Sequence, residues 1–276
     1  MALKARCDRY ALSLGAEIME NGSIDVGSII VTPSIVNVEY RLSYREVDEM
    51  LEEGVAFREE WELGDMLDLA RRRRAYRISN GSMEGMVVQM PTNVLKVHPD
   101  PDAEDGTAIE LEIESQFNSG GNVTAGAVNI QKDTSAYVPN VSPSNLLVTE
   151  MMIMAGEAMG KFGQLCIEER GNSLIGQLEL PYRSQAAPDF RTRPDELRVL
   201  NELSSKRIGG GYCASWYIRR FMRPVSVSKE PLPHKAMGID CYVQWSSPIR
   251  RYGDLQVSTW TISNIVRANE NKQVFS

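Results

Sequence analysis

The segment WSSPIRRYGDL, residues 245–255, places two adjacent arginines directly behind a Ser-Pro pair. A Ser-Pro pair at a helix entrance provides a cap and a first turn with unbonded backbone N–H groups, and such an end attracts phosphate. Arg250 adds a planar, bidentate donor at the same place. Asp254 follows Arg250 by four residues, so an ion pair on the helix surface is an open alternative to an anion site. On either interpretation the last helix begins near Ser247-Pro248.

The N-terminal region shows strand patterns followed by helical ones. Alternating apolar and polar residues over 9–43 predict strands, with an Asn-Gly turn at Glu20–Ser23 between two of them. Residues 43–53 switch to helical spacing, with Ser43 as N-cap and Glu46 completing a capping box. A second helix is predicted from about Arg58 through the arginine run at 71–74, and the sequence SNGS at 79–82 ends it.

Short β-prone runs follow, and the acidic segment at 98–106 is interpreted as a solvated hairpin loop. Its carboxylates leave metal binding open as an alternative, although the loop lacks EF-hand spacing. A long helix is predicted from Pro143 to about Ile167, where methionines fill a core and small residues such as Gly156 and Gly160 let another element approach closely. The pattern predicts an α+β fold, with residues 1–140 rich in strands and residues 141–276 rich in helices.

The composition excludes several classes of protein. The net charge of −7 argues against a sequence-blind polycation, but lysine and arginine cluster at 71–74, 217–224 and 249–251, which is compatible with a polyanionic partner. The four cysteines are scattered, so we expect reduced structural thiols rather than a zinc site. No apolar run is long enough to span a membrane, and the N-terminus lacks a signal-peptide core, so we expect an intracellular protein without membrane contact.

The series His234, Gly238 and Tyr242, followed by SSPIRRYGDL at 246–255, resembles the C-terminal signature of the RNB family, the catalytic domain of ribonuclease II and ribonuclease R. Residues 29–51, 146–159 and 180–185 resemble further family segments in the same order. The resemblance covers nearly the whole chain. It implies that residues 1–276 are a partial RNB-like catalytic domain with a mixed β-sheet wrapped by helices. Some of these segments resemble the organellar branches of the family more than the bacterial ones. Cytoplasm, chloroplast and mitochondrion are therefore all open as locations.

The resemblance implies a function and a set of site residues. The function is a 3′–5′ exoribonuclease that hydrolyses single-stranded RNA to nucleoside 5′-monophosphates with magnesium. By position, Arg250 would contact the scissile phosphate and stabilise the charge that develops on it. Tyr44 would lie near the 3′-terminal bases, where an aromatic ring can stack, or it is an ordinary tyrosine at a strand end. Arg251 and Tyr252 would contact the RNA backbone or serve the structure.

The sequence departs from the family pattern at the metal site. The closely spaced aspartates of the family lie upstream of every segment recognised here, and no stretch of this chain reproduces them. The resemblance therefore implies a missing or separate N-terminal segment that supplies the metal-binding aspartates, and this chain alone is expected to be inactive. The alternatives are a non-catalytic RNB-like protein that binds RNA, and activity through carboxylates that the pattern does not identify.

Overall fold

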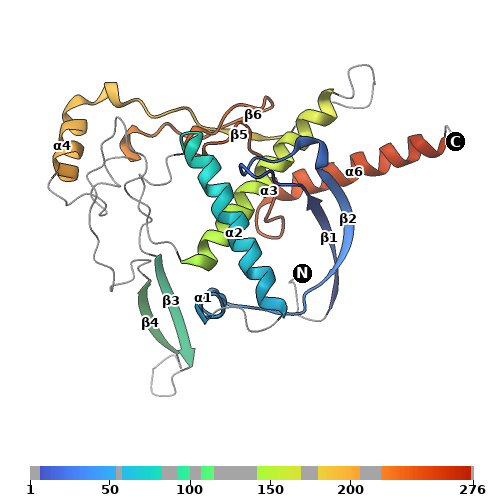
Figure 1. The fold of residues 1–276 in the computed structure, drawn as a ribbon, viewed down its shortest axis with the longest axis horizontal. Coiled ribbons are helices and arrows are strands. Elements are labelled where there is room, and N and C mark those ends of the chain that lie inside the picture. The colour runs from blue at the N-terminus through green and yellow to red at the C-terminus, as the bar shows by residue number, and fades with distance from the viewer. Residues whose placement is uncertain are drawn as a thin grey trace. The chain divides into compact units, whose positions relative to one another are not determined.

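The computed structural model of the protein describes residues 7–53, 58–82, 92–99, 107–114, 142–168, 180–205 and 219–274 (Figure 1). The chain forms two compact units, the first from residues 1–83, 143–187 and 223–276 and the second from 84–142 and 188–222. The first unit holds β1 (Asp8–Gly15), η1 (Val26–Ser28), β2 (Ile30–Asn37), α1 (Tyr44–Glu53), α2 (Arg58–Ser79), α3 (Pro143–Glu168), β5 (Tyr182–Ser184), β6 (Ser226–Ser228), η4 (Lys235–Met237) and α6 (Tyr252–Val274). The second holds β3 (Thr92–Pro99), β4 (Thr107–Glu114), η3 (Phe190–Thr192) and α4 (Pro194–Ser205). This mixture confirms the predicted α+β class.

The strands that the structure describes pair as three antiparallel ribbons, β1 with β2, β3 with β4 and β5 with β6. One face of the β1–β2 ribbon is buried at one end and exposed at the other. Leu14 pairs with Val31, which is buried, whereas Tyr10 pairs with Ile35 and both side chains are exposed. The ribbon β3–β4 brackets the acidic loop that the sequence predicted, but residues 100–106 of that loop lie outside the described residues.

The Asn-Gly turn predicted between the first strands is present. Asn21 Oδ1 accepts the Ser23 N–H at 2.9 Å, and Gly22 has a φ of +87°. A Cβ atom on Gly22 would lie 2.5 Å from the Arg72 carbonyl oxygen of α2, so only glycine fits this approach. The single-turn helix η1 follows the turn and lengthens the connection into β2.

The first two helices have the predicted bounds and cap. The Ser43 N–H donates to Glu46 Oε2 at 2.6 Å and the Glu46 N–H donates to Ser43 Oγ at 3.3 Å, which is the reciprocal capping box. These hydrogen bonds to Ser43 lower the pKa of Glu46 below its ordinary value. The helix α2 ends at Ser79, where a turn over Asn80 and Gly81 replaces it.

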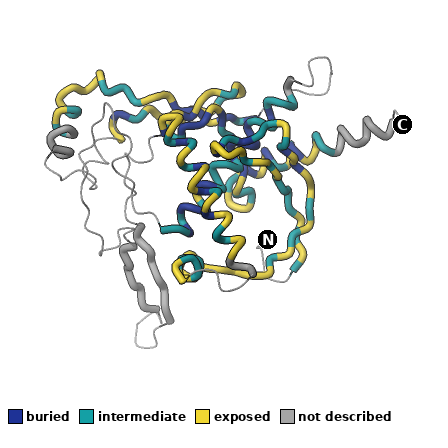
Figure 2. The backbone as a smooth tube through the Cα atoms, viewed as in Figure 1, coloured by how far each residue is buried: buried dark blue, intermediate teal, exposed yellow. Residues whose placement is uncertain are grey.

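The helix α3 is the buried central helix that its small and apolar residues predicted. It packs against α1 and α2, and Ala158 and Met159 are fully buried (Figure 2). Asp48 of α1 accepts the Ser144 N–H at 2.8 Å and so satisfies one of the unbonded donors at the start of α3. The core cluster of this unit consists of Ile24, Ile29, Val31, Ala158, Met159, Leu180, Tyr182, Cys241, Val243, Trp245 and Val257.

Candidate functional site

The Ser-Pro-Ile-Arg segment forms a separate turn rather than the first turn of the last helix. The Ser247 carbonyl accepts the N–H groups of Arg250 at 3.2 Å and of Arg251 at 3.1 Å, and the Ser247 N–H donates to Asp254 Oδ2 at 2.8 Å. The helix α6 begins at Tyr252, so the predicted start near Ser247-Pro248 is wrong by about one turn. The reason is Asp254: its buried carboxylate caps the Ser247 N–H from inside the helix and closes the turn before it.

Arg250 lies at the outside of this turn. Its side chain is exposed, and within the described part of the chain no hydrogen bond or ion pair engages its guanidinium. The ion pair between Arg250 and Asp254, which the spacing left open, is not formed. Instead the Asp254 carboxylate bonds the Ser247 N–H and lies 3.8 Å from Arg251 Nη1. The turn therefore presents one arginine to solvent with all of its donors available.

The other two predicted residues of the segment differ from each other. Arg251 is half-buried and its Nη2 donates to Ser247 Oγ at 3.1 Å, so this guanidinium is bound into the turn. Tyr252 opens α6 with 75% of its surface exposed, next to Ile249, which is 67% exposed. Arg250 and Tyr252 are thus both exposed, whereas Arg251 is bound into the turn between them.

The segment that precedes the turn is fixed on α3 by contacts with its small residues. The Val243 N–H donates to the Gly156 carbonyl at 3.0 Å, and Trp245 Nε1 donates to the Ala155 carbonyl at 3.0 Å. The Tyr242 ring covers Gly156 so closely that a Cβ atom there would lie 2.1 Å from the ring. This is the close approach that the small residues of α3 predicted, and it anchors the chain a few residues before Arg250.

The start of the same segment is fixed on α2. Gly238 has a φ of +68°, and a Cβ atom there would lie 2.3 Å from the Arg77 carbonyl oxygen. The Arg77 side chain returns to the segment, because its Nη1 donates to the Met237 carbonyl at 2.9 Å. His234 is buried in this turn, and burial lowers its pKa below the ordinary histidine value. Its Nδ1 atom is buried without a hydrogen-bond partner in the described structure.

Two buried ion pairs join α2 to α3. Arg77 bonds both carboxylate oxygens of Glu150, with Nε 2.9 Å from Oε2, and Arg73 pairs with Glu157. All four side chains are at most 1% exposed, and Lys161 adds a second contact to Glu157 at 2.8 Å. The sequence patterns did not predict these pairs. The available signal was the presence of two glutamates in a helix predicted to be buried, because buried carboxylates require partners.

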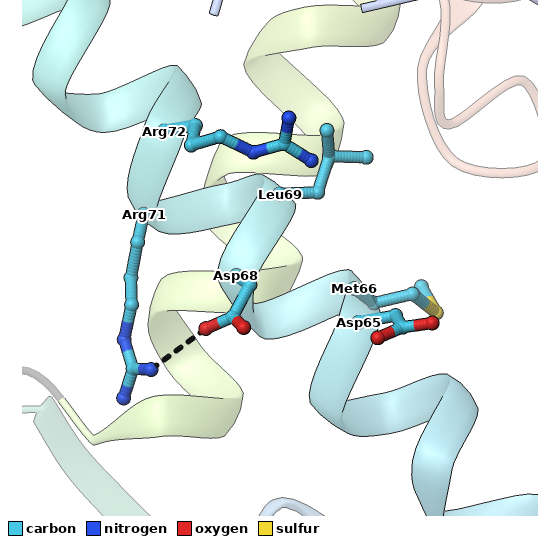
Figure 3. Close-up of a pocket in the computed structure, with 6 residues that line it drawn as sticks. All are labelled: Asp65, Met66, Asp68, Leu69, Arg71 and Arg72. Carbon is cyan, nitrogen blue, oxygen red and sulfur yellow. Dashed lines mark hydrogen bonds and ion pairs between the residues drawn. The ribbon is translucent and has the colours of Figure 1, made fainter. Parts of the chain in front are cut away.

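The arginine run at 71–74 is therefore divided between the interior and the surface. Arg73 is buried, whereas Arg71 and Arg72 lie on the exposed side of α2 and line an open hollow of about 800 Å³ with Asp65 and Asp68 (Figure 3). Arg71 Nη1 pairs with Asp68 Oδ1 at 2.9 Å, one turn away on the same helix. The run is thus not one polyanion-facing cluster, because Arg73 is buried and Arg71 is paired on its own helix.

Tyr44 lies apart from the arginine turn in the chain, at the first position of α1. It is 52% exposed and lines a groove of about 650 Å³. Leu63 of α2 together with Leu147 and Val148 of α3 supplies apolar lining, and Arg41 lies beside Tyr44. An apolar groove with an aromatic and a cationic side chain has the chemistry to hold a nucleobase and its phosphate.

Comparison with known proteins assigns the fold and the segment to one family. The profile of the RNB domain matches residues 1–265. The chain belongs to the RNB domain family. This confirms the family suggested by the signature at 234–255, and the segments at 29–51, 146–159 and 180–185 lie within the same match.

Two curated relatives match along most of this chain. An uncharacterized ribonuclease of Synechocystis is 30% identical over 250 residues, which are 91% of this chain and 29% of the relative. The chloroplastic and mitochondrial ribonuclease II of Arabidopsis thaliana is 27% identical over 273 residues, 98% of this chain and 27% of the relative. The chain thus spans less than a third of the length of these relatives.

Solved structures show the same fold at low sequence identity. The RNase R of Mycoplasma genitalium, in complex with ribose-methylated single-stranded RNA, superposes with a TM-score of 0.62 at 16% identity, over 94% of this chain and 37% of that one. Yeast Ssd1, described as a pseudonuclease, gives a TM-score of 0.53 at 16% identity, over 95% of this chain and 30% of that one. The fold is therefore shared by proteins with and without nuclease activity.

The carboxylates that the structure describes do not form a site that fits a magnesium ion. Among the residues that the structure describes, no three His, Cys, Asp or Glu side chains come together as a metal site. The buried ones are already engaged: Glu150 by Arg77, Glu157 by Arg73 and Lys161, and Asp254 by the Ser247 N–H. Magnesium needs oxygen ligands that are not neutralised by arginine.

The described part also contains no helix long and apolar enough to cross a membrane.

Proposed function

We propose that this RNB domain forms the RNA-binding and phosphate-contacting part of a 3′–5′ exoribonuclease that hydrolyses single-stranded RNA to nucleoside 5′-monophosphates. The observation that carries the proposal is Arg250, an exposed guanidinium without a protein partner in the described structure, held on a turn that Asp254 closes. A relative that carries the same family domain is a ribonuclease II, and a protein of the same fold is described in complex with single-stranded RNA.

In this proposal Arg250 contacts the scissile phosphate at its nonbridging oxygens. Attack of water on the terminal phosphodiester breaks the bond to the 3′-oxygen of the preceding nucleotide, and a nucleoside 5′-monophosphate leaves. Negative charge grows on the phosphate oxygens during this step, and two parallel N–H donors of a guanidinium stabilise it. Tyr44 stacks a base near the 3′ end, and Tyr252 contacts the strand beside Arg250.

Of the two roles that the sequence left open for Arg251, we propose mainly the structural one. Its guanidinium already bonds Ser247 Oγ and faces Asp254. We therefore place it as a residue that shapes the turn, with any contact to the RNA backbone made by its remaining exposed donors. Exoribonucleases of this family are generally metal-dependent, so the carboxylates that hold magnesium would come from outside the described residues, on this polypeptide or on a partner.

The test is RNA binding by the 276-residue chain and its Arg250 variants. Wild type, Arg250→Gln and Arg250→Lys are titrated against a labelled single-stranded RNA of about 20 nucleotides at several salt concentrations. We expect Arg250→Gln to weaken binding and to lower the salt slope by about 0.7, the value for one lost phosphate contact on a single strand. Arg250→Lys keeps the charge and the slope but loses the bidentate fork, so its affinity should be intermediate.

The matched control is Arg71→Gln, which removes one exposed arginine that is paired on its own helix. It should bind RNA like wild type. If Arg250→Gln and Arg71→Gln have the same affinity and slope as wild type, Arg250 does not contact RNA. In the polypeptide that also carries the metal ligands, Arg250→Gln should slow release of 5′-monophosphates by about 10²–10³-fold, the usual effect of removing one charge-stabilising donor.

The alternative is a non-catalytic RNB-like protein that binds RNA, and one observation favours it. Glu150, Glu157 and Asp254 all bond internal partners, so these three carboxylates serve the fold. The two functions predict different native polypeptides. Its mass and N-terminal sequence, read from the source cells, should reveal a longer chain with clustered aspartates if it is an enzyme. A native chain that begins at Met1, binds RNA and leaves it intact in magnesium would support the alternative.

A further inference from the structure

The second unit carries a cluster of arginines that the proposed site does not use. Its described residues include η3, the start of α4 and the turn at 219–222. The Asp189 N–H donates to the Phe221 carbonyl at 3.4 Å, and the rings of Phe190 and Phe221 lie 5.2 Å apart. These contacts hold η3 and the turn at 219–222 together.

The centre of the cluster is a carboxylate shared by two guanidinium groups. Glu196 Oε1 accepts Arg193 Nη1 at 3.3 Å and Arg220 Nη2 at 2.8 Å. The Glu196 side chain is 23% exposed, whereas those of Arg193 and Arg220 are 43% and 38% exposed. The two guanidinium groups are thus more exposed than the carboxylate that they share.

The same chain segments carry three further exposed arginines. Arg191 lies within η3, Arg198 lies on the outward face of α4 and Arg219 precedes Arg220, and all three are exposed. Within the described residues, no hydrogen bond or ion pair engages their side chains. The Asp189 carboxylate accepts the backbone N–H of Arg191 rather than its guanidinium, so it leaves that charge in place.

The composition of this surface argues for a phosphate partner. Residues 188–199 and 219–222 hold five arginines, three acidic residues and no lysine, within a chain of net charge −7. Guanidinium groups bind phosphate bidentately and are more weakly hydrated than ammonium groups, so arginine is favoured where phosphates are contacted. Of the two aromatic rings that the structure describes here, Phe221 is 3% exposed and Phe190 is half-buried and faces it, so neither is fully open for base stacking.

We propose that Arg191, Arg193, Arg198, Arg219 and Arg220 form a second RNA-binding surface that contacts the phosphate backbone without reading bases. Its partner class rests on the proposed function, but its residues are independent of Arg250. Its contribution to binding is electrostatic, so it depends on salt and not on sequence.

The experiment uses the 276-residue chain and a labelled single-stranded RNA of about 40 nucleotides in a salt series. The double variant Arg191→Gln with Arg219→Gln removes two charges that make no contact in the described structure. We expect its salt slope to fall by about 1.4, two single-strand phosphate contacts, with affinity roughly tenfold lower at low salt. Arg198→Glu, on the outward face of α4, should weaken binding in the same direction.

The control is Arg45→Gln with Arg71→Gln, which removes the same charge from exposed ion pairs of the first unit. It should bind like wild type. If the second-unit variants match this control while Arg250→Gln loses affinity, the second surface is overturned and the proposed function stands. Loss in the second-unit variants with no effect of Arg250→Gln would support the second surface and overturn the phosphate-contacting role of Arg250. Competition by polyglutamate as strong as that by RNA of equal charge would assign the surface to an acidic protein and overturn the proposal.

Discussion

The arginines of α2 and the arginine of the turn before α6 belong to similar runs in the sequence, but they have opposite surroundings. Arg73 and Arg77 are at most 1% exposed, and each faces a glutamate of α3. Arg250 is exposed, and no described residue pairs with it. A cluster of positive charge therefore predicts a phosphate site only where buried carboxylates of the same protein do not take up its donors.

The difference has an energetic consequence. An arginine and a glutamate that are both removed from water lose several kcal/mol of hydration each, and their pairing must offset that loss. Such a pair cannot be given up to a ligand. Arg250 keeps its hydration until an anion replaces it, so its donors are available for binding. The α2 arginines thus determine how α2 and α3 pack, and the turn arginine determines what the surface can bind.

The largest expected effect tests the buried side of this comparison. Arg77→Met should lower the free energy of unfolding by about 3–5 kcal/mol, because it leaves the Glu150 carboxylate buried and unpaired. Arg250→Met, on the exposed side, should change it by less than about 0.5 kcal/mol. Both are measured by urea denaturation of the 276-residue chain.

The double variant Arg77→Met with Glu150→Met sharpens the result. It removes both charges, so it should unfold at a higher urea concentration than Arg77→Met alone. If the two variants are equally unstable, the loss comes from packing around Met237 and Ser82 rather than from the unpaired carboxylate. If Arg77→Met is as stable as Arg250→Met, the contrast between the two arginine sites is wrong.

A second contrast concerns glycines in filled and in open surroundings. Gly156→Ala places a Cβ atom 2.1 Å from the Tyr242 ring, whereas Gly64→Ala on α2 meets nothing within 4 Å. Gly156→Ala should cost roughly 1–3 kcal/mol through overpacking, and Gly64→Ala should stabilise α2 by about 0.5–1 kcal/mol. Thermal melts of both variants check this. Equal melting temperatures would mean that the segment at 241–245 moves away from α3 without cost.

The fold was largely predictable because its local signals agree with one another. The capping box at Ser43 and Glu46, the Asn-Gly turn and the small residues of α3 each specify a geometry within a few residues, and all were found. The start of α6 was not predictable in the same way. Ser247-Pro248 is a good helix entrance, but the buried Asp254 carboxylate captures the Ser247 N–H and moves the start to Tyr252.

The site was predictable in type but not in detail. The signature residues specify Arg250, and the structure leaves that side chain exposed, although its role stays a prediction. The pairs Arg77–Glu150 and Arg73–Glu157 join residues 73 and 84 positions apart, and spacing along the chain contains no information about such contacts. The cluster around Glu196 likewise depends on Arg220, which comes from a distant segment.

Substitution of Asp254 tests the turn that exposes Arg250 and binds Arg251. Asp254→Ala removes the acceptor of the Ser247 N–H and should cost about 1–2 kcal/mol of stability, with weaker RNA binding because Arg250 is no longer fixed. Asp254→Asn keeps an oxygen acceptor and should restore most of the affinity. RNA titrations with stability-matched samples measure this. If the Asp254→Asn and Asp254→Ala variants bind RNA equally poorly, the turn is held by the carboxylate charge near Arg251 and not by the hydrogen bond to Ser247.

The smallest expected effect concerns His234, which lies in the turn that Arg77 and Gly238 fix on α2. Because burial lowers its pKa, the folded protein binds a proton on His234 less readily than the unfolded chain does. Stability should therefore be unaffected above the ordinary histidine value of about 6.5 and should fall below it, by at most about 1.4 kcal/mol per pH unit. His234→Gln should flatten this dependence between about pH 6.5 and pH 5 in urea denaturation. His98→Gln, which removes the other histidine of the chain, should leave the dependence as in wild type. A pH dependence that survives in His234→Gln and disappears in His98→Gln would place the sensitive group outside this turn.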